Sequence, residues 1–262
     1  MPFLQSGIFV RHDPETASVP LVVDVSRSGR VYPKEFRSPL AFTVLHDNVS
    51  MYVEDLWAGA PSVGATMLYC CFPNTFMDVN RKEDDLDPAV IDGQWPTPLN
   101  PTPVAIRGLG LIKTKSRYGE PMQERKLTVA EIQERFDVYY HPYHRELKRI
   151  VDETHAKHGL MWQLSCHCMS AVGAPTHADA GQPRAHLVVR DLGREKGGLP
   201  LDEGMIDVRP EPPEHGGRIL QVPVPGRQDL EQDEVLRCQH ANRLAPEGAG
   251  DGPVQRRVRE AR

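Results

Sequence analysis

Residues 163–262 contain no aromatic side chain, because every Phe, Tyr and Trp of this 262-residue chain lies at or before Trp162. Aromatic side chains supply large buried areas, and a folded core seldom lacks them over such a length. From about Arg184 onward the sequence is also rich in Pro, Gly, Arg and Glu. That composition buries too little apolar surface to offset the entropy cost of ordering. We therefore predict one ordered domain over residues 1–190 and a poorly ordered tail over residues 191–262.

The sequence also lacks the marks of membrane, secreted and nucleic-acid-binding proteins. No apolar run approaches the ~20 residues that span a bilayer, and no basic segment followed by an apolar stretch begins the chain. The formal charge of -5 gives no electrostatic reason to bind nucleic acid or an anionic membrane. The five cysteines are odd in number and show no disulfide spacing, which predicts reduced thiols in a cytoplasmic protein. Nothing in the sequence indicates the oligomeric state.

The ordered part alternates between strand and helix patterns. Short apolar runs predict buried strands over 21–25, 65–72, 104–114 and 160–166, and apolar residues at helical spacing predict a helix over 48–60. Thr128 and Glu131 form a capping-box pattern that opens a long helix, which Pro142 should kink or restart. This alternation predicts an α/β fold with a largely parallel sheet flanked by helices.

Three loops follow the predicted strands and should meet at the carboxyl edge of the sheet, where such folds carry their sites. The loops span residues 26–30, 72–81 and 166–169. His167, just past a strand, is placed to bind a metal or to act as a general base; the alternative is a histidine that only forms hydrogen bonds at the sheet edge. His141 and His144 can share a helix face, or they can simply flank the kink at Pro142.

Arginines in the first two loops are candidate carboxylate ligands, since a guanidinium binds a carboxylate through two hydrogen bonds. They are Arg27, Arg30 and Arg81, and the alternative for each is a solvated surface charge. Asp78 and Arg81 could also form a structural ion pair. Cys166 and Cys168 flank His167, which makes a thiol nucleophile conceivable, but alternate residues of a strand point away from the residue between them.

Taken in order, these segments resemble N-formylglutamate amidohydrolases over about residues 15–190. The similarity lies in residues 20–29, 52–57, 76–81, 140–144, 167–169 and 181–185. The resemblance implies an α/β hydrolase similar to zinc carboxypeptidases. It also implies hydrolysis of N-formyl-L-glutamate, or a related N-acyl amino acid, to formate and the free amino acid, a late step of histidine breakdown.

The resemblance further implies the roles of individual residues. A divalent metal ion such as zinc would polarise the formyl carbonyl and activate water, with His167 as a ligand and His167 and His144 as catalytic residues. Asn80 and Arg81 would bind the substrate, and the chemistry of its guanidinium predicts the same role for Arg27. Asp78 and Gly29 would shape the loops.

Several positions depart from the family pattern. Arg27 stands where the family has a first-loop histidine that holds the metal, and a guanidinium cannot ligate a cation. Residues 47–50 offer no clear match to the family's acidic residue, and Ser165 stands where many members carry an acid. The alternative hypothesis is therefore an inactive or truncated remnant that at most binds a carboxylate ligand. The change of composition also suggests a frameshift near residues 184–192.

Overall fold

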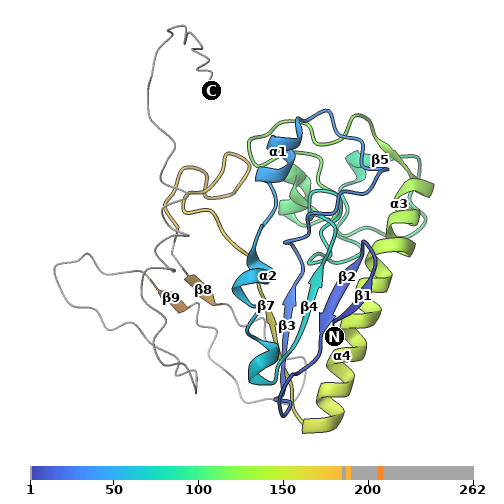
Figure 1. Ribbon diagram of the computed structural model, residues 1–262. Helices are drawn as coiled ribbons and strands as arrows, with labels where there is room; N and C mark the ends of the chain where they lie inside the picture. The colour runs from blue at the N-terminus through green and yellow to red at the C-terminus, as the bar shows by residue number, and fades with distance from the viewer. Residues whose placement is uncertain (1, 185–186, 190–205, 209–262) are drawn as a thin grey trace, which may run out of the picture. The chain divides into compact units, whose positions relative to one another are not determined.

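The computed structural model describes residues 2–184, 187–189 and 206–208. Its main element is a five-stranded sheet with the strand order β1-β2-β4-β3-β7 (Figure 1). The strands are β1 (Phe3–Gln5), β2 (Phe9–His12), β3 (Leu21–Val25), β4 (Thr66–Cys70) and β7 (Trp162–Ser165). In the described part of the chain, no helix has both the length and the apolar character needed to cross a membrane.

The sheet is mixed. β3 lies between β4 and β7 and runs parallel to both. β2 pairs with β4 and β1 pairs with β2, both in the antiparallel sense. The prediction of an α/β fold is confirmed, but the prediction of a largely parallel sheet is wrong, because residues 3–12 add an antiparallel hairpin at one edge. The similarity to zinc carboxypeptidases stays a prediction.

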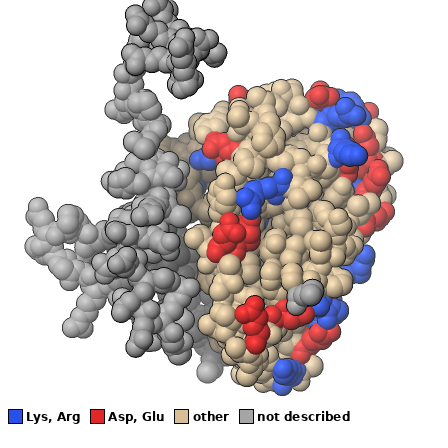
Figure 2. Space-filling model, in the orientation of Figure 1, with Lys and Arg blue, Asp and Glu red and all other residues tan. Residues whose placement is uncertain are grey.

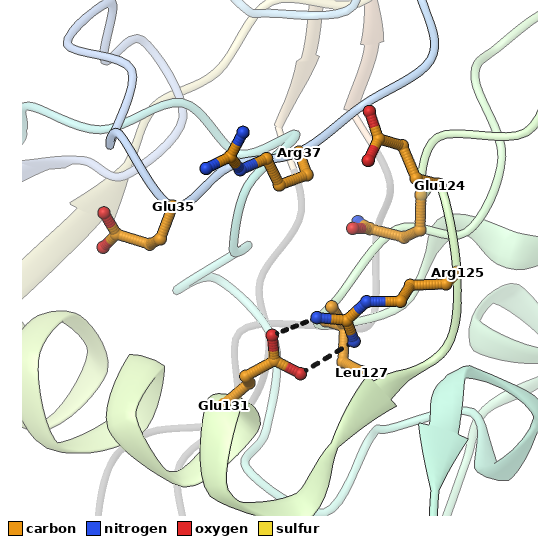
Figure 3. Close-up of a pocket in the computed structure, with 7 residues that line it drawn as sticks. Glu35, Arg37, Glu124, Arg125, Leu127 and Glu131 are labelled. Atoms are coloured by element: carbon orange, nitrogen blue, oxygen red, sulfur yellow. Dashed lines mark hydrogen bonds and ion pairs between the residues drawn. The ribbon is translucent and has the colours of Figure 1, made fainter.

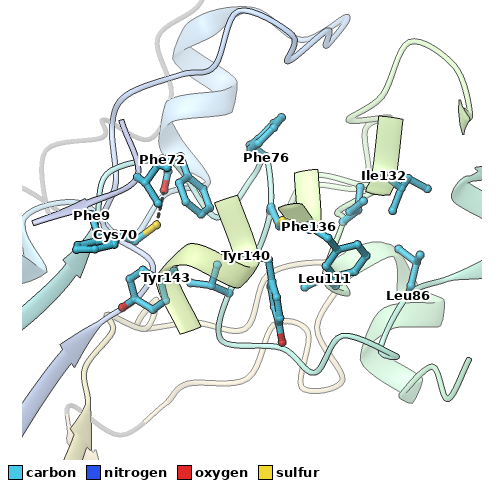
Figure 4. Close-up of a cluster of buried hydrophobic side chains, with 14 of the residues drawn as sticks. Phe9, Cys70, Phe72, Phe76, Leu86, Leu111, Ile132, Phe136, Tyr140 and Tyr143 are labelled. Carbon is cyan, nitrogen blue, oxygen red and sulfur yellow. Dashed lines mark hydrogen bonds between the residues drawn. The ribbon is translucent and has the colours of Figure 1, made fainter. Parts of the chain in front are cut away.

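Side chains of β3 alternate between two cores, as expected for a strand that is buried on both faces. Val22 packs into a cluster with residues of β2, β4 and the long helical segment, whereas Val23 and Val25 pack with residues from α2 and its flanks. Figure 4 shows the first cluster, in which Tyr143 lies beside Phe9 and Cys70. The rings of Tyr143 and Phe9 meet edge to face with centroids 6.5 Å apart.

The predicted long helix is confirmed but is interrupted. It comprises α3 (Val129–Arg135), a π-helical turn η4 (Phe136–Tyr140) and α4 (His141–His158). Thr128 and Glu131 form both hydrogen bonds of the capping box. The wider turn directly precedes Pro142, whose ring has no N–H to donate to the preceding turn. Opposite charges alternate along the exposed side of α4. Figure 2 shows Lys and Arg side chains next to Asp and Glu side chains on this face of the molecule.

The remaining elements are short. They are α1 (Phe42–Asp47), α2 (Val53–Leu56), η1 (Pro61–Val63), η2 (Pro88–Val90), β5 (Ile91–Asp92), η3 (Ala105–Leu109), β6 (Leu127–Thr128), β8 (Leu187–Val189) and β9 (Ile206–Val208). β5 pairs with β6, and β8 pairs with β9. Apart from β9, the predicted tail over 191–262 lies outside the described residues, as does most of the segment where the frameshift was suspected.

Two sequence predictions are wrong for local backbone reasons. The helix expected over 48–60 is reduced to the four residues of α2, because Tyr52 adopts a left-handed conformation with φ of 64° that ends any helix. The strand expected over 104–114 is instead the π-helical η3, in which Gly108 has φ of 95°. Glycine tolerates that conformation, and its neighbours then turn back instead of extending.

The strand predicted over 160–166 is present as β7, but the prediction that it is buried is wrong. β7 is largely solvent-exposed, and Trp162 keeps 54% of its surface accessible. Among the described residues β7 pairs only with β3. It therefore forms an edge of the sheet in this part of the chain, although its apolar residues would suit a covered position.

Asp24 is a buried carboxyl group within β3, with 3% of its surface exposed. It accepts a hydrogen bond from the Tyr143 hydroxyl of α4 and another from Gln163 Nε2 of β7 at 3.3 Å. Burial raises the pKa of Asp24 from 3.8 to about 6, against the opposing effect of these hydrogen bonds and of Arg27. Asp24 thus links three elements and resists ionisation.

Replacing this carboxyl group should change how stability depends on pH. The folded chain holds the Asp24 proton more tightly than the unfolded chain. The resulting stabilisation of the folded state is fully present below pH 3.8 and is lost as the pH rises through about 6. An asparagine side chain cannot titrate. The free energy of unfolding of Asp24→Asn, relative to the parent, should therefore rise by about 2 kcal/mol between pH 4 and pH 7. Urea unfolding across that range measures it. Asp92→Asn, at an exposed carboxylate, is the control, and parallel curves for both variants would refute the assignment.

Candidate functional site

The first two loops meet at the carboxyl edge of the parallel strands, as predicted. Val31 N–H donates to the Cys71 carbonyl at 2.8 Å, and Ser28 forms a β-bridge with Pro73. Gly29 lies so close to this backbone that a Cβ would stand 2.2 Å from the Phe72 oxygen. No other residue fits there without moving the backbone, so Gly29 sets how closely the loops approach.

Asp78 is the centre of the loop cluster, with 2% of its surface exposed. Arg27 Nε donates to its Oδ1 at 2.9 Å, and Arg81 Nε lies 3.9 Å from its Oδ2. The Asn80 N–H also donates to Oδ1, at 3.2 Å, while the Asp78 N–H donates to the Leu111 carbonyl at 2.8 Å. Burial alone would raise the pKa of Asp78, but the surrounding cations, Arg27 first, lower it below its ordinary value.

His167, on the third loop, is exposed to solvent and lies within range of the charges of this cluster. Partial desolvation of the ring and the positive charge of Arg27 lower its pKa below the ordinary value. Asp78 and Arg81 act on the same ring with opposite signs. The structure therefore brings together Arg27, Asp78, Arg81 and His167, four of the residues that the sequence indicated.

His144 is tied to the far side of the same loop. Its Nε2 lies 3.0 Å from the Val79 carbonyl, and because a carbonyl only accepts, Nε2 carries the proton. The ring packs 4.2 Å from that of Tyr140, whose hydroxyl donates to the Arg81 carbonyl at 2.9 Å. These contacts hold the backbone around Asp78 in place. A catalytic role of His144 stays a prediction.

Two further predicted residues lie apart from the charge cluster. The side chain of Asn80 is exposed and makes no hydrogen bond with the described residues, so its role in substrate binding stays a prediction. Arg30 pairs with Glu54 at 2.7 Å, and its guanidinium lies 4.8 Å from the centre of the Tyr52 ring. Arg30 is thus engaged elsewhere.

The sequence analysis missed two residues beside the cluster. Lys113 keeps only 9% of its surface exposed, and burial lowers its pKa to about 8. His177 lies where the charges of Lys113 and Arg117 both act on its ring. A lysine that directly follows the apolar pair Leu111 and Ile112 was the available signal, since charged residues are seldom buried without a reason.

Comparison with known proteins identifies the family. A sequence model described as N-formylglutamate amidohydrolase matches residues 19–203, which is 185 of the 262 residues. The chain belongs to the N-formylglutamate amidohydrolase family. The predicted resemblance is confirmed, and residues 204–262 lie outside the match.

A solved member of the family is similar to this chain in structure and sequence. The crystal structure of N-formylglutamate amidohydrolase from Ralstonia eutropha JMP134 superposes with a TM-score of 0.61 at 40% identity. The alignment covers 62% of this chain and 58% of that chain, so this chain spans less than two thirds of its relative. No curated protein matches the sequence.

The described residues do not fit the metal ion that the resemblance implies. Within the described part of the chain, no group of three or more His, Cys, Asp and Glu side chains is arranged to hold a metal. Asp78 is the acid whose charge acts on the His167 ring, and it already pairs with Arg27 and Arg81. Guanidinium groups cannot ligate a cation and would repel one. The donor chemistry around His167 therefore favours an anion.

Cys166 and Cys71 are poorly suited to act as nucleophiles. Burial raises the pKa of Cys166 to about 12 and that of Cys71 to about 11. A thiol with such a pKa is almost wholly protonated at neutral pH, and the thiolate is the reactive form. These observations disfavour a mechanism that starts at either thiol.

Two small cavities of the described chain are lined by residues outside the charge cluster. One of about 240 Å³ is lined by Glu83, Asp84, Trp95 and Thr97. The other, of about 20 Å³, holds roughly one water and lies between Glu35 and the Arg125–Glu131 ion pair (Figure 3). Neither is lined by Arg27, Asp78 or His167. The candidate site is therefore a charged rim at the sheet edge.

The pairing of Arg27 with Asp78 can be tested through stability. Arg27→Met should cost about 3 kcal/mol at pH 7, because it removes the closest partner of a buried carboxylate. Arg30→Met, at a more exposed pair, should cost no more than about 1 kcal/mol. Since the folded pKa of Asp78 is depressed, the stabilisation is present above pH 3.8 and is lost as the pH falls through the folded value. Urea unfolding at pH 7 and pH 3 checks both statements, and equal losses for the two variants would contradict them.

Proposed function

We propose that this chain is an amide hydrolase that releases formate from N-formyl-L-glutamate. Family membership supports the reaction class. The observation that supports the proposal is that the charges of Arg27, Asp78 and Arg81 act on the His167 ring, since a proton acceptor would then lie near groups that could bind a carboxylate. A substrate with an amide bond close to a carboxylate needs both.

The two arginines would bind the carboxylate next to the formyl-amide nitrogen. Arg27 contacts Asp78 through Nε, and its two terminal nitrogens make no hydrogen bond with the described residues. A guanidinium held in this way offers an edge with two donors to a carboxylate. Arg81 adds a second positive charge on the other side of Asp78. Asp78 would then act indirectly, by fixing the orientation of both guanidinium groups.

His167 would move the proton. A water oxygen adds to the formyl carbon while His167 accepts one of the water protons, and the same imidazole then delivers the proton to the departing amide nitrogen. The carbon–nitrogen bond breaks, and formate and glutamate leave. The lowered pKa of His167 keeps the ring neutral near pH 7, the form that accepts a proton. Histidine breakdown, in which such a step occurs, is the metabolic setting that we infer for this reaction.

A formate-release assay on the full chain tests the proposal. The parent should release one formate per N-formyl-L-glutamate, and His167→Ala should lower kcat/KM about 10²- to 10⁴-fold, because it removes the group that transfers the proton. His155→Ala, at an exposed position of α4, is the matched control and should leave kcat/KM unchanged.

The assay is repeated with added zinc and with a chelator, to show whether a metal contributes. Absence of formate under all three conditions would overturn the proposal. The chain would then be a family member that at most binds a carboxylate, which calorimetry with L-glutamate would measure independently of turnover.

A further inference from the structure

Two side chains of the long helical segment hold the backbone on either side of Asn80. The Tyr140 hydroxyl donates to the Arg81 carbonyl at 2.9 Å, and His144 Nε2 donates to the Val79 carbonyl at 3.0 Å. The partners are 59 and 65 positions apart in the sequence, so both contacts are tertiary. Two long-range hydrogen bonds therefore end on a stretch of three residues within the candidate site.

Tyr140 and His144 reach the loop from one face of the helical segment. Residues four positions apart are neighbours on a helix surface, and the centroids of these two rings are 4.2 Å apart. The Phe136 ring packs against the other side of Tyr140, edge to face, with centroids 5.3 Å apart. Packing on both sides restricts the Tyr140 ring, so its hydroxyl is a donor with a fixed direction.

The side chain of Arg81 is held more loosely than that of Arg27. Its Nε lies 3.9 Å from Asp78 Oδ2, and its Nη1 lies 3.5 Å from Asp85 Oδ2. The buried Nε makes no hydrogen bond with the described residues. Arg27 Nε, in contrast, donates to Asp78 Oδ1 at 2.9 Å. Contacts of 3.5 Å and more are weak hydrogen bonds at best, so they fix the direction of a guanidinium less well.

The backbone of Arg81 is instead fixed on both sides. Its N–H donates to the Asp78 carbonyl at 3.0 Å, while its carbonyl accepts from Tyr140. The Asp78 N–H in turn donates to the Leu111 carbonyl at 2.8 Å. The Arg81 side chain keeps 22% of its surface exposed. A ligand can therefore reach a guanidinium whose starting point is held in place, which lowers the entropy cost of binding.

We propose that Tyr140 and His144 are positioning residues, whose two hydrogen bonds hold Arg81 where it binds the substrate carboxylate. This inference rests on the proposed function and deepens it. It adds Tyr140 to the residues on which substrate binding depends. It also gives His144 a role through the loop backbone instead of at the reacting atoms.

Steady-state kinetics of formate release by the full chain separate positioning from catalysis. Tyr140→Phe removes only the hydroxyl, so it should raise KM for N-formyl-L-glutamate about 3- to 10-fold, as expected for one hydrogen bond, and should leave kcat within about twofold. His144→Ala should have the same effect. His144→Gln keeps an N–H donor without the imidazole, and it should restore most of the lost affinity.

Tyr139→Phe is the matched control. Tyr139 is the adjacent tyrosine of the same π-helical turn, and its hydroxyl donates to Glu35 Oε1 at 2.5 Å instead of to the loop. This variant loses the same atom and should leave both KM and kcat unchanged. Thermal unfolding verifies that each variant is folded.

Calorimetry with L-glutamate tests the same inference without requiring turnover. Tyr140→Phe should weaken L-glutamate binding about 3- to 10-fold, whereas Tyr139→Phe should not. If Tyr140 acts through Arg81, then Tyr140→Phe should cause no further loss when it is combined with Arg81→Met. Equal and additive losses in the double variant would overturn the inference. A fall in kcat at unchanged KM in Tyr140→Phe or in His144→Gln would overturn it as well.

The inference and the proposed function fail in different ways. A chain that binds L-glutamate with the expected dependence on Tyr140 and Arg81, but releases no formate, would disprove the hydrolase and support the positioning role. A chain that releases formate with a KM that Tyr140→Phe does not change would support the hydrolase and disprove the positioning role. A chain that neither binds L-glutamate nor releases formate would overturn both.

Discussion

The candidate site depends on one buried carboxylate. Asp78 lies at the junction of the first two loops, and its charge is tolerable in that position only because Arg27 and Arg81 surround it. The same interaction fixes both guanidinium groups beside His167. The loops can meet there because β3, β4 and β7 run parallel and end at one edge. Without Asp78 the arginines would repel one another, and the rim would lose its order.

Local rules were sufficient to predict much of this arrangement from sequence. The apolar run of β3, the capping box at Thr128 and the order of the three loops follow from residue periodicity, and they led to Arg27, Asp78, Arg81 and His167. The errors arose where tertiary context or an unusual backbone angle decided the structure. Tyr52 and Gly108 adopt positive φ values that residue patterns do not reveal, and the hairpin of β1 and β2 has too few residues for a clear pattern.

The partner of a charged side chain is harder still to predict. Nothing local distinguishes Arg27, which orients the site, from Arg30, which turns toward Glu54. The segment of Lys113 meets the cluster only through a bond between distant parts of the chain, from the Asp78 N–H to the Leu111 carbonyl. The resemblance implies a metal-ligating histidine at the position of Arg27, whose guanidinium cannot ligate a cation.

The π-helical turn at Phe136–Tyr140 sets the rotation of α4 about its own axis. Each α-helical residue advances the chain by about 100°, so a turn with one extra residue turns every later side chain by that angle. Tyr143 reaches Asp24, and His144 reaches the Val79 carbonyl, only with this offset in place. A relative that lacked one residue of the turn would have a more regular helix but would present a different face of α4 to the sheet. The π-helical turn therefore determines the rotational register of α4. A single-residue deletion here should disturb the packing of α4 more than most substitutions along the helix.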